Sequence, residues 1–245
     1  MKRGGRIFVA LVCVLVLGSG LWLARKWQIR RGEMTARAEA VLQNAETLGP
    51  EGREKYRNLA KWYNYNLERG TPGLWSYYPE ILDLGKGAMA VLEVPEWDLL
   101  LPVFHGAAVP VGHDPATPLP LGGRGNHTVL TISNWFPWRE GQRLYIDCLG
   151  QKLCYRVESV RVLSPGWSTD RPTEGGQELL TLVFDHENSR TIIRCIRSTE
   201  LELREEPRRE YFRATLTVGP GVLIFLLLIY GVRKIWKNVR RNWGI

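Results

Sequence analysis

Cysteine and histidine are scarce in this sequence, with four of each in 245 residues. None of them has the close spacing of a metal-binding motif, and no motif indicates a cofactor, so we expect neither. Cys148 and Cys154 bracket a predicted hairpin turn at residues 149–151, where strand alternation does not favour a direct bridge. We therefore expect Cys148, Cys154 and Cys195 to be small buried residues rather than a disulfide framework.

Acidic residues are absent from both ends of the chain. Residues 1–25 hold four Lys or Arg side chains and residues 214–245 hold five, with no Asp or Glu in either segment. The formal net charge of +8 therefore resides at the ends, because residues 26–213 carry 24 basic and 25 acidic side chains. A nearly neutral middle offers no basic domain to a nucleic acid, and we expect no nucleic-acid partner.

The basic ends flank two long apolar runs. Residues 7–24 contain no charge over 18 residues, and residues 214–232 contain none over 19. As helices, these runs would be about 27–29 Å long, close to the bilayer core of about 30 Å. The alternatives are a cleaved signal peptide for the first run and a buried core helix for the second. We interpret both as transmembrane helices, because the first lacks a convincing cleavage site and charged segments flank the second.

The basic tail, residues 233–245, predicts the orientation of the chain. Under the positive-inside rule this tail is cytoplasmic. Since two spans require both termini on one side, residues 1–6 are then cytoplasmic too. The chain between the spans is expected outside the cell membrane, as a helical segment over 25–87, a β-domain over 88–204 and a juxtamembrane linker over 205–213.

Apolar spacing changes from helical to strand-like along this middle part. Apolar residues recur with helical spacing over Met34–Leu48 and Tyr56–Leu67, and Gly49-Pro50 separates the two helices. From Ala88 onward the chain shows seven or eight short β-rich runs that turn residues separate. The pattern predicts a mainly β fold, a closed or nearly closed barrel preceded by a helical pair.

Several of these segments match the pattern of a known family. LEVPEWDLLLPVFHG (92–106), followed by LPLGGRGNHTVLTISN (119–134), resembles the sortases, the membrane-anchored cysteine transpeptidases of Gram-positive bacteria. The class C, pilin-polymerising branch fits best. LAKWYNYNLE (59–68) resembles that family's YN-containing helix, and ELLTLVFDHENSRTIIRC (178–195) takes the place of its nucleophile-bearing strand and the next. The resemblance implies a sortase-like closed β-barrel flanked by two transmembrane helices.

The catalytic positions of that family are altered here. A sortase uses a cysteine thiolate as nucleophile, a histidine as acid and base, and an arginine that steadies the substrate. By the resemblance, the histidine position is Ser133, the nucleophile position is Asp185, and only the arginine is retained, as Arg190. His127 falls on a second, non-catalytic histidine of the family, and His186 is expected on the opposite face of the strand. The resemblance therefore implies a sortase scaffold without an intact catalytic centre.

Asp185 and Arg190 are expected to pair across the substrate groove. The acid would then neutralise the guanidinium that binds substrate carbonyls in the family. If the pair is buried, removing one partner costs about 3–5 kcal/mol. The alternative is two solvated charges at strand ends.

Aromatic residues gather in two further places. Trp135 and Trp138 lie in a proline-containing loop, and together with Trp97 and Trp167 they are either partner-binding or core-packing residues. The sequence favours neither interpretation. Residues 70–80 take the place of the class C lid but lack its Asp-Pro pair, so we interpret their aromatic side chains as packing residues.

Taken together, the sequence predicts a membrane-anchored, catalytically inactive sortase-like protein at the cell surface. It would serve as an accessory or binding module in surface-protein or pilus assembly, with pilin subunits or a catalytic sortase as partners. The candidate binding residues are Arg190, Trp135 and Trp138. Two alternatives are an active, cysteine-independent transpeptidase or peptide hydrolase that uses Asp185, and a sensor domain that signals through the short tails.

Overall fold

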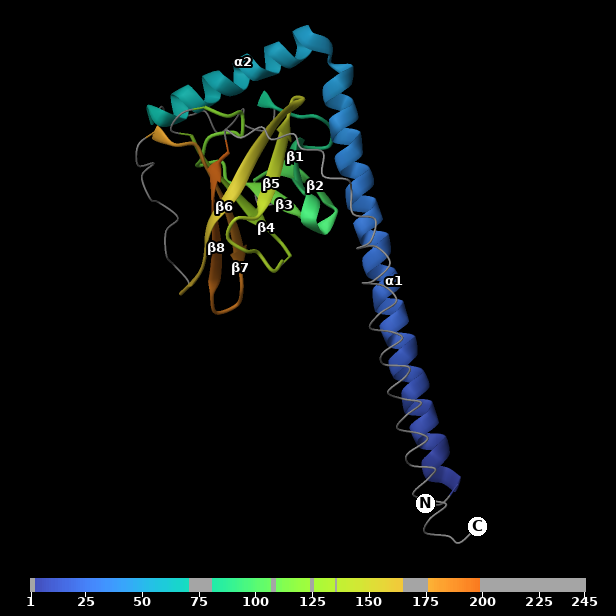
Figure 1. Cartoon of the computed structure of the whole chain (residues 1–245). Helices are drawn as coiled ribbons and strands as arrows, with labels where there is room; N and C mark the ends of the chain where they lie inside the picture. The colour runs from blue at the N-terminus through green and yellow to red at the C-terminus, as the bar shows by residue number, and fades with distance from the viewer. Residues whose placement is uncertain are drawn as a thin grey trace. The chain divides into compact units, whose positions relative to one another are not determined.

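The computed structural model describes most of the chain up to residue 198 (Figure 1). The second unit of the chain, residues 201–245, lies outside the described residues, and with it the predicted span 214–232. Side chains are described from Leu15 onward, except at residue 17. The described residues are 3–70, 81–106, 109–123, 126–134, 136–164 and 176–198.

Eight strands form a closed barrel in the order β1-β2-β3-β4-β7-β8-β6-β5. This confirms the mainly β fold that the sequence predicts. Only the three-residue β3 was absent from the predicted β-rich runs. The strands are β1 (Ala88–Val94), β2 (Leu99–His105), β3 (Val111–His113), β4 (His127–Ile132), β5 (Arg143–Cys148), β6 (Gln151–Leu163), β7 (Leu179–Asp185) and β8 (Arg190–Arg197).

Two of the strand pairs are parallel, β2 with β3 and β4 with β7, and the others are antiparallel. Buried and partly exposed residues alternate along β8, as expected for a strand with one face on a core. The inward side chains of the barrel are aliphatic and fully buried, among them Leu92, Val103, Leu130, Leu182 and Ile193. Burial of this apolar surface is the main force that closes the barrel.

The β5–β6 hairpin explains why no disulfide links Cys148 and Cys154. Leu149 and Gly150 form a two-residue turn with positive φ angles of 55° and 73°, the pattern of a type I′ hairpin. Cys148 therefore pairs with Gln151, whereas Cys154 pairs with Tyr145. Both cysteines are buried and unbridged, as is Cys195, in agreement with the expectation from the sequence.

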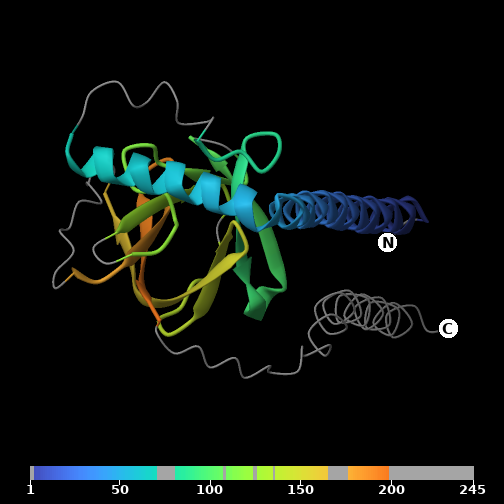
Figure 2. The ribbon, with the colours of Figure 1, turned by 90° about the horizontal axis from the view of Figure 1, so that it is seen from above.

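Two helices precede the barrel, α1 (Arg3–Thr47) and α2 (Gly49–Glu68). The chain turns between them at Gly49, whose φ of 65° favours glycine, and Pro50 stands in the first turn of α2, where its missing N–H is tolerated. Helix α2 lies across one end of the barrel, as the view from above shows (Figure 2). The predicted helical pair is confirmed.

Helix α2 is held on the barrel by the YN pair of its sequence. Tyr63 is fully buried, and its hydroxyl donates a hydrogen bond to Pro115 O at 2.8 Å. Asn64 exchanges two hydrogen bonds with the backbone of Leu119. These contacts join α2 to the segment that leads into β4.

The C-terminal half of α1 packs beside β1 and β2 through Ala38, Val41 and Ala45. Nearer its middle, Arg31 donates hydrogen bonds to Trp97 O at 2.8 Å and to Asp98 O at 2.5 Å, in the turn between β1 and β2. The helix is thereby attached to the barrel at both of these places.

The membrane spans stay predictions. Within the described part of the chain, no helix is long and apolar enough to cross a membrane. The predicted span 7–24 falls inside α1, on which Leu15, Leu21 and Trp22 expose most of their surface.

Candidate functional site

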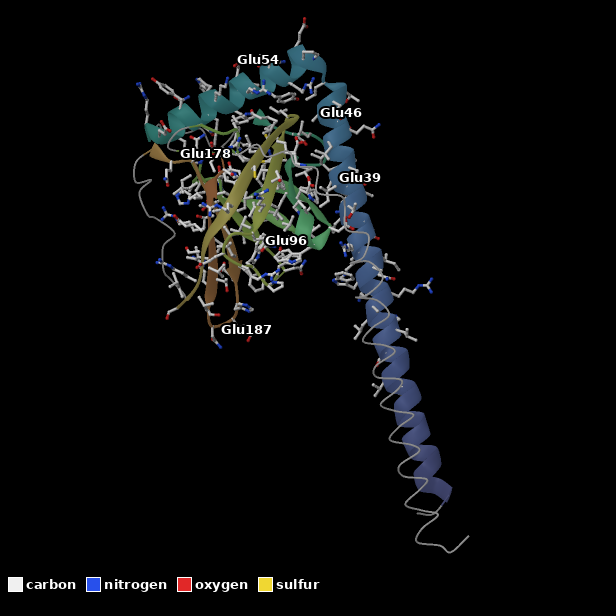
Figure 3. The ribbon with its side chains drawn as sticks, in the orientation of Figure 1. Glu39, Glu46, Glu54, Glu96, Glu178 and Glu187 are labelled. Atoms are coloured by element: carbon white, nitrogen blue, oxygen red, sulfur yellow. The ribbon has the colours of Figure 1, made fainter. Side chains whose placement is uncertain are left out.

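The barrel brings Ser133, Asp185 and Arg190, which the sequence resemblance assigns to the catalytic positions of sortases, to one end. Strands β4 and β7 are adjacent and parallel, with Thr131 opposite Val183. Ser133 follows the end of β4, and Asp185 ends β7, so both lie at the same end of the barrel. Strand β8 returns from a tight hairpin so that Arg190 pairs directly with Asp185. Figure 3 marks this end of the barrel by Glu187 in the β7–β8 turn, and the opposite end by Glu178.

Asp185 and Arg190 form a bidentate ion pair. Arg190 Nε donates to Asp185 Oδ1 at 2.5 Å, and Arg190 Nη2 donates to Asp185 Oδ2 at 3.2 Å. The hydrogen bond to Asp185 is the main reason why the pKa of Arg190 is raised. The pairing that the sequence predicts is therefore present.

The pair is not buried, so the alternative of solvated charges at strand ends describes its surroundings better. Exposed fractions are 51% for the Asp185 side chain and 31% for that of Arg190. Both residues stand at the ends of their strands, and residues 186–188 of the turn are exposed, so that water reaches the pair. An ion pair in this setting contributes up to about 1 kcal/mol, well below the contribution of a buried pair.

No imidazole stands at the histidine position. Ser133 is exposed directly after β4, and its N–H donates to Pro110 O at 3.0 Å. His127 lies six residues earlier, roughly 20 Å away along the strand. The Nε2 atom of His127 is 2.8 Å from Thr181 Oγ1. The exposed His186 packs its ring against Phe184, with the centroids 4.3 Å apart. Neither histidine takes the place of the missing one.

The described cysteines cannot supply the missing thiolate. Cys148, Cys154 and Cys195 are buried within the barrel wall and core. Burial raises the pKa of Cys148 to about 12 and also raises the pKa of Cys195. Since the thiolate is the reactive form, these two side chains are chemically inert near neutral pH.

The aromatic loop is a packing cluster in its described part. Trp97 stacks on Phe136 at a centroid distance of 5.3 Å and meets Trp138 edge-on at 4.7 Å. Trp138 keeps only 8% of its surface exposed. Of the two interpretations that the sequence left open for Trp138, this burial favours core packing, because a side chain buried against two other rings presents little surface to a partner. Trp135, Trp167 and residues 71–80 lie outside the described residues.

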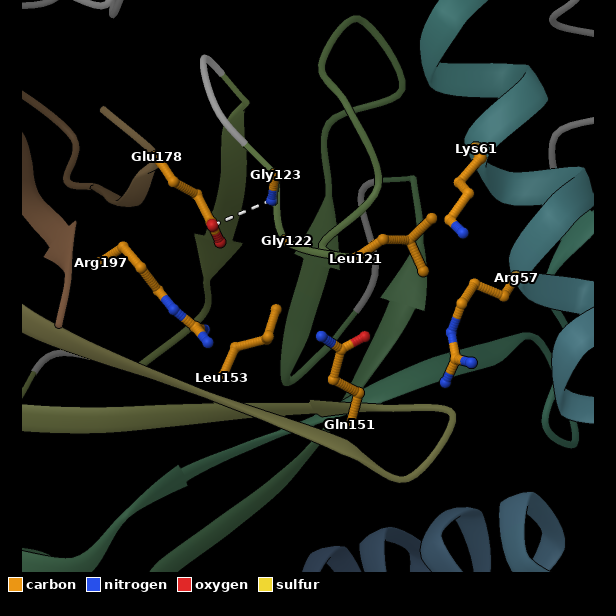
Figure 4. A pocket seen from close by; sticks show the side chains of 9 residues that line it. All are labelled: Arg57, Lys61, Leu121, Gly122, Gly123, Gln151, Leu153, Glu178 and Arg197. Carbon is orange, nitrogen blue, oxygen red and sulfur yellow. Dashed lines mark hydrogen bonds between the residues drawn. The ribbon is translucent and has the colours of Figure 1, made fainter. Parts of the chain in front are cut away.

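A cavity of about 530 Å³ lies at the other end of the barrel, beneath α2 (Figure 4). Its polar lining includes Arg57 and Lys61 from α2, Gln151 from β6, Arg197 from β8 and Glu178. Sequence reasoning missed this cavity, because its residues are scattered along the chain and no local pattern connects them. Among the described residues, no group of three His, Cys, Asp or Glu side chains is arranged to hold a metal ion.

No protein-family model matches the sequence, and no curated protein is similar to it. Solved structures are similar in fold. Sortase C1 of GBS pilus island 1 is 24% identical with a TM-score of 0.60, and the match covers 72% of this chain and 98% of that one. Sortase C from Clostridium perfringens SM101 is 21% identical with a TM-score of 0.58, covering 66% of this chain and 98% of that one.

A further structure shows Clostridium perfringens sortase C with the C-terminal cell wall sorting motif. It is 21% identical, has a TM-score of 0.57, and the match covers 66% of this chain and 98% of that one. These matches extend over nearly the whole length of the solved enzymes. The fold of this chain is therefore that of the class C sortases, as the sequence motifs indicate.

Proposed function

We propose that this chain is a membrane-anchored, non-catalytic sortase-like protein. It acts as an accessory or binding module in the assembly of pili or other surface proteins. In this proposal residues 25–213 lie outside the cell membrane and both termini lie in the cytoplasm. The observation that carries the proposal is the Asp185–Arg190 ion pair at the altered catalytic end.

Asp185 and Arg190 each argue against sortase chemistry. A carboxylate is a much weaker nucleophile toward an unactivated amide than a thiolate, so Asp185 does not replace the cysteine. Arg190 also directs two N–H groups at Asp185 rather than at a substrate carbonyl. A guanidinium that is already paired offers less stabilisation to a developing oxyanion.

A binding role is supported by the intact scaffold. The barrel is closed, and α2 is docked on it through buried hydrogen bonds. The solved neighbours include a sortase of a pilus island and one in a structure with a cell wall sorting motif. We therefore propose a pilin subunit, another protein with a sorting signal, or a catalytic sortase as the partner.

Anchoring is supported by exposed apolar side chains on several sides of α1. Leu15, Leu21, Trp22 and Leu23 each expose more than half of their surface. Such large apolar side chains are costly to expose to water over consecutive turns of a helix. Insertion of residues 7–24 into a bilayer would remove that cost.

A peptide assay separates this proposal from the alternative of an active enzyme. The full-length chain, purified in a non-ionic detergent, is incubated with an LPxTG-type sorting-signal peptide and an amine acceptor. We expect neither cleavage nor transfer. Product that disappears in Asp185→Ala would overturn the proposal and favour a cysteine-independent transpeptidase or hydrolase.

Crosslinking in the native membrane tests the binding role itself. We expect a pilin subunit or a sortase to be captured by the full-length chain. Repeated capture of neither, under conditions that crosslink a known membrane complex of the same cells, would count against the accessory role.

A further inference from the structure

The cavity beneath α2 is separate from the altered catalytic end. Glu178 precedes β7 and lines the cavity, whereas Asp185 ends the same strand. The seven residues of β7 separate the two places by roughly 20 Å. In Figure 3, Glu178 is labelled at the cavity end of the barrel and Glu187 at the opposite end. No part of the proposed function uses this cavity.

Basic side chains reach the cavity from two sides. Arg57 and Lys61 are four residues apart on α2 and project from the same helix face. Arg197 comes from the end of β8, and Figure 4 shows it across the cavity from these two side chains. Leu121 and Leu153 form an apolar part of the wall. Three positive charges therefore converge on one cavity of about 530 Å³, a volume typical of small-ligand sites.

Glu178 is the only acidic residue among the described lining residues, and it has structural partners of its own. Its Oε1 accepts a hydrogen bond from the Tyr155 hydroxyl at 2.5 Å, and its Oε2 accepts one from Gly123 N at 3.0 Å. These bonds fix the carboxylate on its own side of the cavity. The described lining residues carry a net charge of +2, from three basic side chains and one acidic one.

Arg57 pairs with an acid on the helix surface, and Arg197 interacts with the Tyr155 hydroxyl, which itself binds Glu178. Arg57 donates to Glu54 at 2.9 Å, a pair on the helix surface in which Glu54 is half exposed. Exposed pairs of this kind contribute little and release their partners readily. The buried Nη1 of Arg197 has no hydrogen-bond partner among the described residues, and its guanidinium lies 5.5 Å from the centroid of the Tyr155 ring. A ligand with several acceptor oxygens would satisfy this group of donors.

We propose that this cavity binds a phosphate group. Two guanidinium groups and an ammonium group are the side chains that bind phosphate oxygens with bidentate and charge-assisted hydrogen bonds. A doubly charged phosphate neutralises the net charge of the lining, whereas a single carboxylate leaves half of it. The amide of Gln151 adds a neutral donor to the same wall.

The phosphate belongs to a ligand outside the bilayer that anchors the protein. This step rests on the proposed function. If residues 7–24 span the membrane, the remaining residues of α1 up to Thr47 extend about 35 Å along the helix axis before α2 begins. The headgroups of the anchoring bilayer would then lie far from a cavity beneath α2. A phosphate-bearing polymer or a soluble phosphate compound fits that position better.

Titration calorimetry with inorganic pyrophosphate tests the site. The full-length chain in a non-ionic detergent is titrated at low ionic strength. We expect saturable binding that Lys61→Gln weakens about fivefold or more, and that Arg57→Gln/Lys61→Gln weakens further, since each removes a charge-assisted hydrogen bond. Lys55→Gln is the matched control, because Lys55 is exposed on the same helix but outside the cavity lining. It should leave the affinity unchanged, and unfolding temperatures confirm that all variants fold.

Two outcomes would overturn phosphate binding by this cavity, and a third would overturn only its assignment to a ligand outside the bilayer. One is the absence of binding to both pyrophosphate and phospholipid vesicles at millimolar concentration. Another is equal affinity in the wild type, Lys61→Gln and the double variant, which would place the anion elsewhere. The third is binding to vesicles of phosphatidylglycerol and phosphatidylcholine that Lys61→Gln abolishes, without any binding of pyrophosphate. That result would assign the phosphate to a lipid. None of these outcomes depends on peptide cleavage or on crosslinking, so a failure of the site can be distinguished from a failure of the proposed function.

Discussion

Asn64 and the backbone of Leu119 hydrogen-bond in both directions. The side-chain amide nitrogen of Asn64 donates to Leu119 O at 3.1 Å, and its amide oxygen accepts from Leu119 N at 2.8 Å. Both residues are buried. Because one side chain satisfies both polar groups of a buried peptide residue, this contact fixes α2 on the end of the barrel.

Substitution Asn64→Ala should therefore destabilise the protein strongly. It leaves the N–H and C=O groups of Leu119 without these partners, at a cost of about 2–4 kcal/mol in the free energy of unfolding. Asn66→Ala is the control, since the described hydrogen bonds of the Asn66 side chain go only to Trp62 O in its own helix. Denaturant unfolding of the full-length chain measures both. Equal stability of the two variants would contradict this role of Asn64.

Arg190→Ala should have only a small effect on stability. The Asp185–Arg190 pair is bidentate but partly solvated, so its loss should cost no more than about 1 kcal/mol. A double-mutant cycle with Asp185→Asn isolates the coupling between the two side chains. A coupling of 3 kcal/mol or more, the range of a buried pair, would show that water does not reach this end of the barrel.

Stability should fall as the pH is lowered from about 6.5 towards 4, in part because of His113. This fully buried ring has its pKa lowered to about 4, chiefly by burial, while the hydrogen bond to Pro118 O opposes the shift. Above pH 6.5 both the folded and the unfolded states hold the ring neutral. Between 6.5 and 4 only the unfolded state takes up the proton, which favours unfolding by up to about 3 kcal/mol.

The variant His113→Gln separates this contribution from the others. Glutamine can still donate to Pro118 O but does not titrate, so the decline of the unfolding temperature between pH 6.5 and 4 should become shallower. Some decline should remain, because burial also lowers the pKa of His105. Superimposable pH profiles of the variant and the wild type would refute the assignment.

The barrel cysteines should resist thiol reagents. In a Cys13→Ser background, we expect Cys148, Cys154 and Cys195 to remain unlabelled by a maleimide at pH 7.5 in the native protein, since all three are buried. After denaturation all three should react. Mass spectrometry counts the labelled sites. Rapid native labelling of any one of them would reveal a reactive thiol and reopen the possibility of cysteine chemistry.

Local patterns predicted most of the fold. The helical spacing of apolar residues predicted two helices with a break at Gly49-Pro50, and seven β-rich runs correspond to strands. Strand β3 was missed because three residues are too few for alternation to be visible. The parallel pairing of β4 with β7 joins residues about fifty positions apart, and no local pattern specifies such a partner.

Sequence motifs could nominate the residues of the candidate site, but they could not predict how exposed those residues are. Motif positions singled out Ser133, Asp185 and Arg190, and the barrel places them at one end. Sequence alone did not show that the ion pair is solvated, because exposure depends on the short turn that follows β7. The burial of Trp138 depends in the same way on Trp97, about forty residues earlier in the chain.

Closure of the barrel restricts how any partner can bind. Each described strand has a hydrogen-bonded neighbour on both sides, from β1 round to β5 and back to β1. An extended peptide therefore finds no strand of the barrel whose whole edge is unpaired, the arrangement by which many domains capture peptides regardless of side chains. A peptide could add to the sheet only where pairing stops along a strand, as along β2, in which β3 pairs with Val103–His105 alone. Most of the recognition should then come from side chains and loops, and substitutions there should change partner choice while leaving the backbone framework intact.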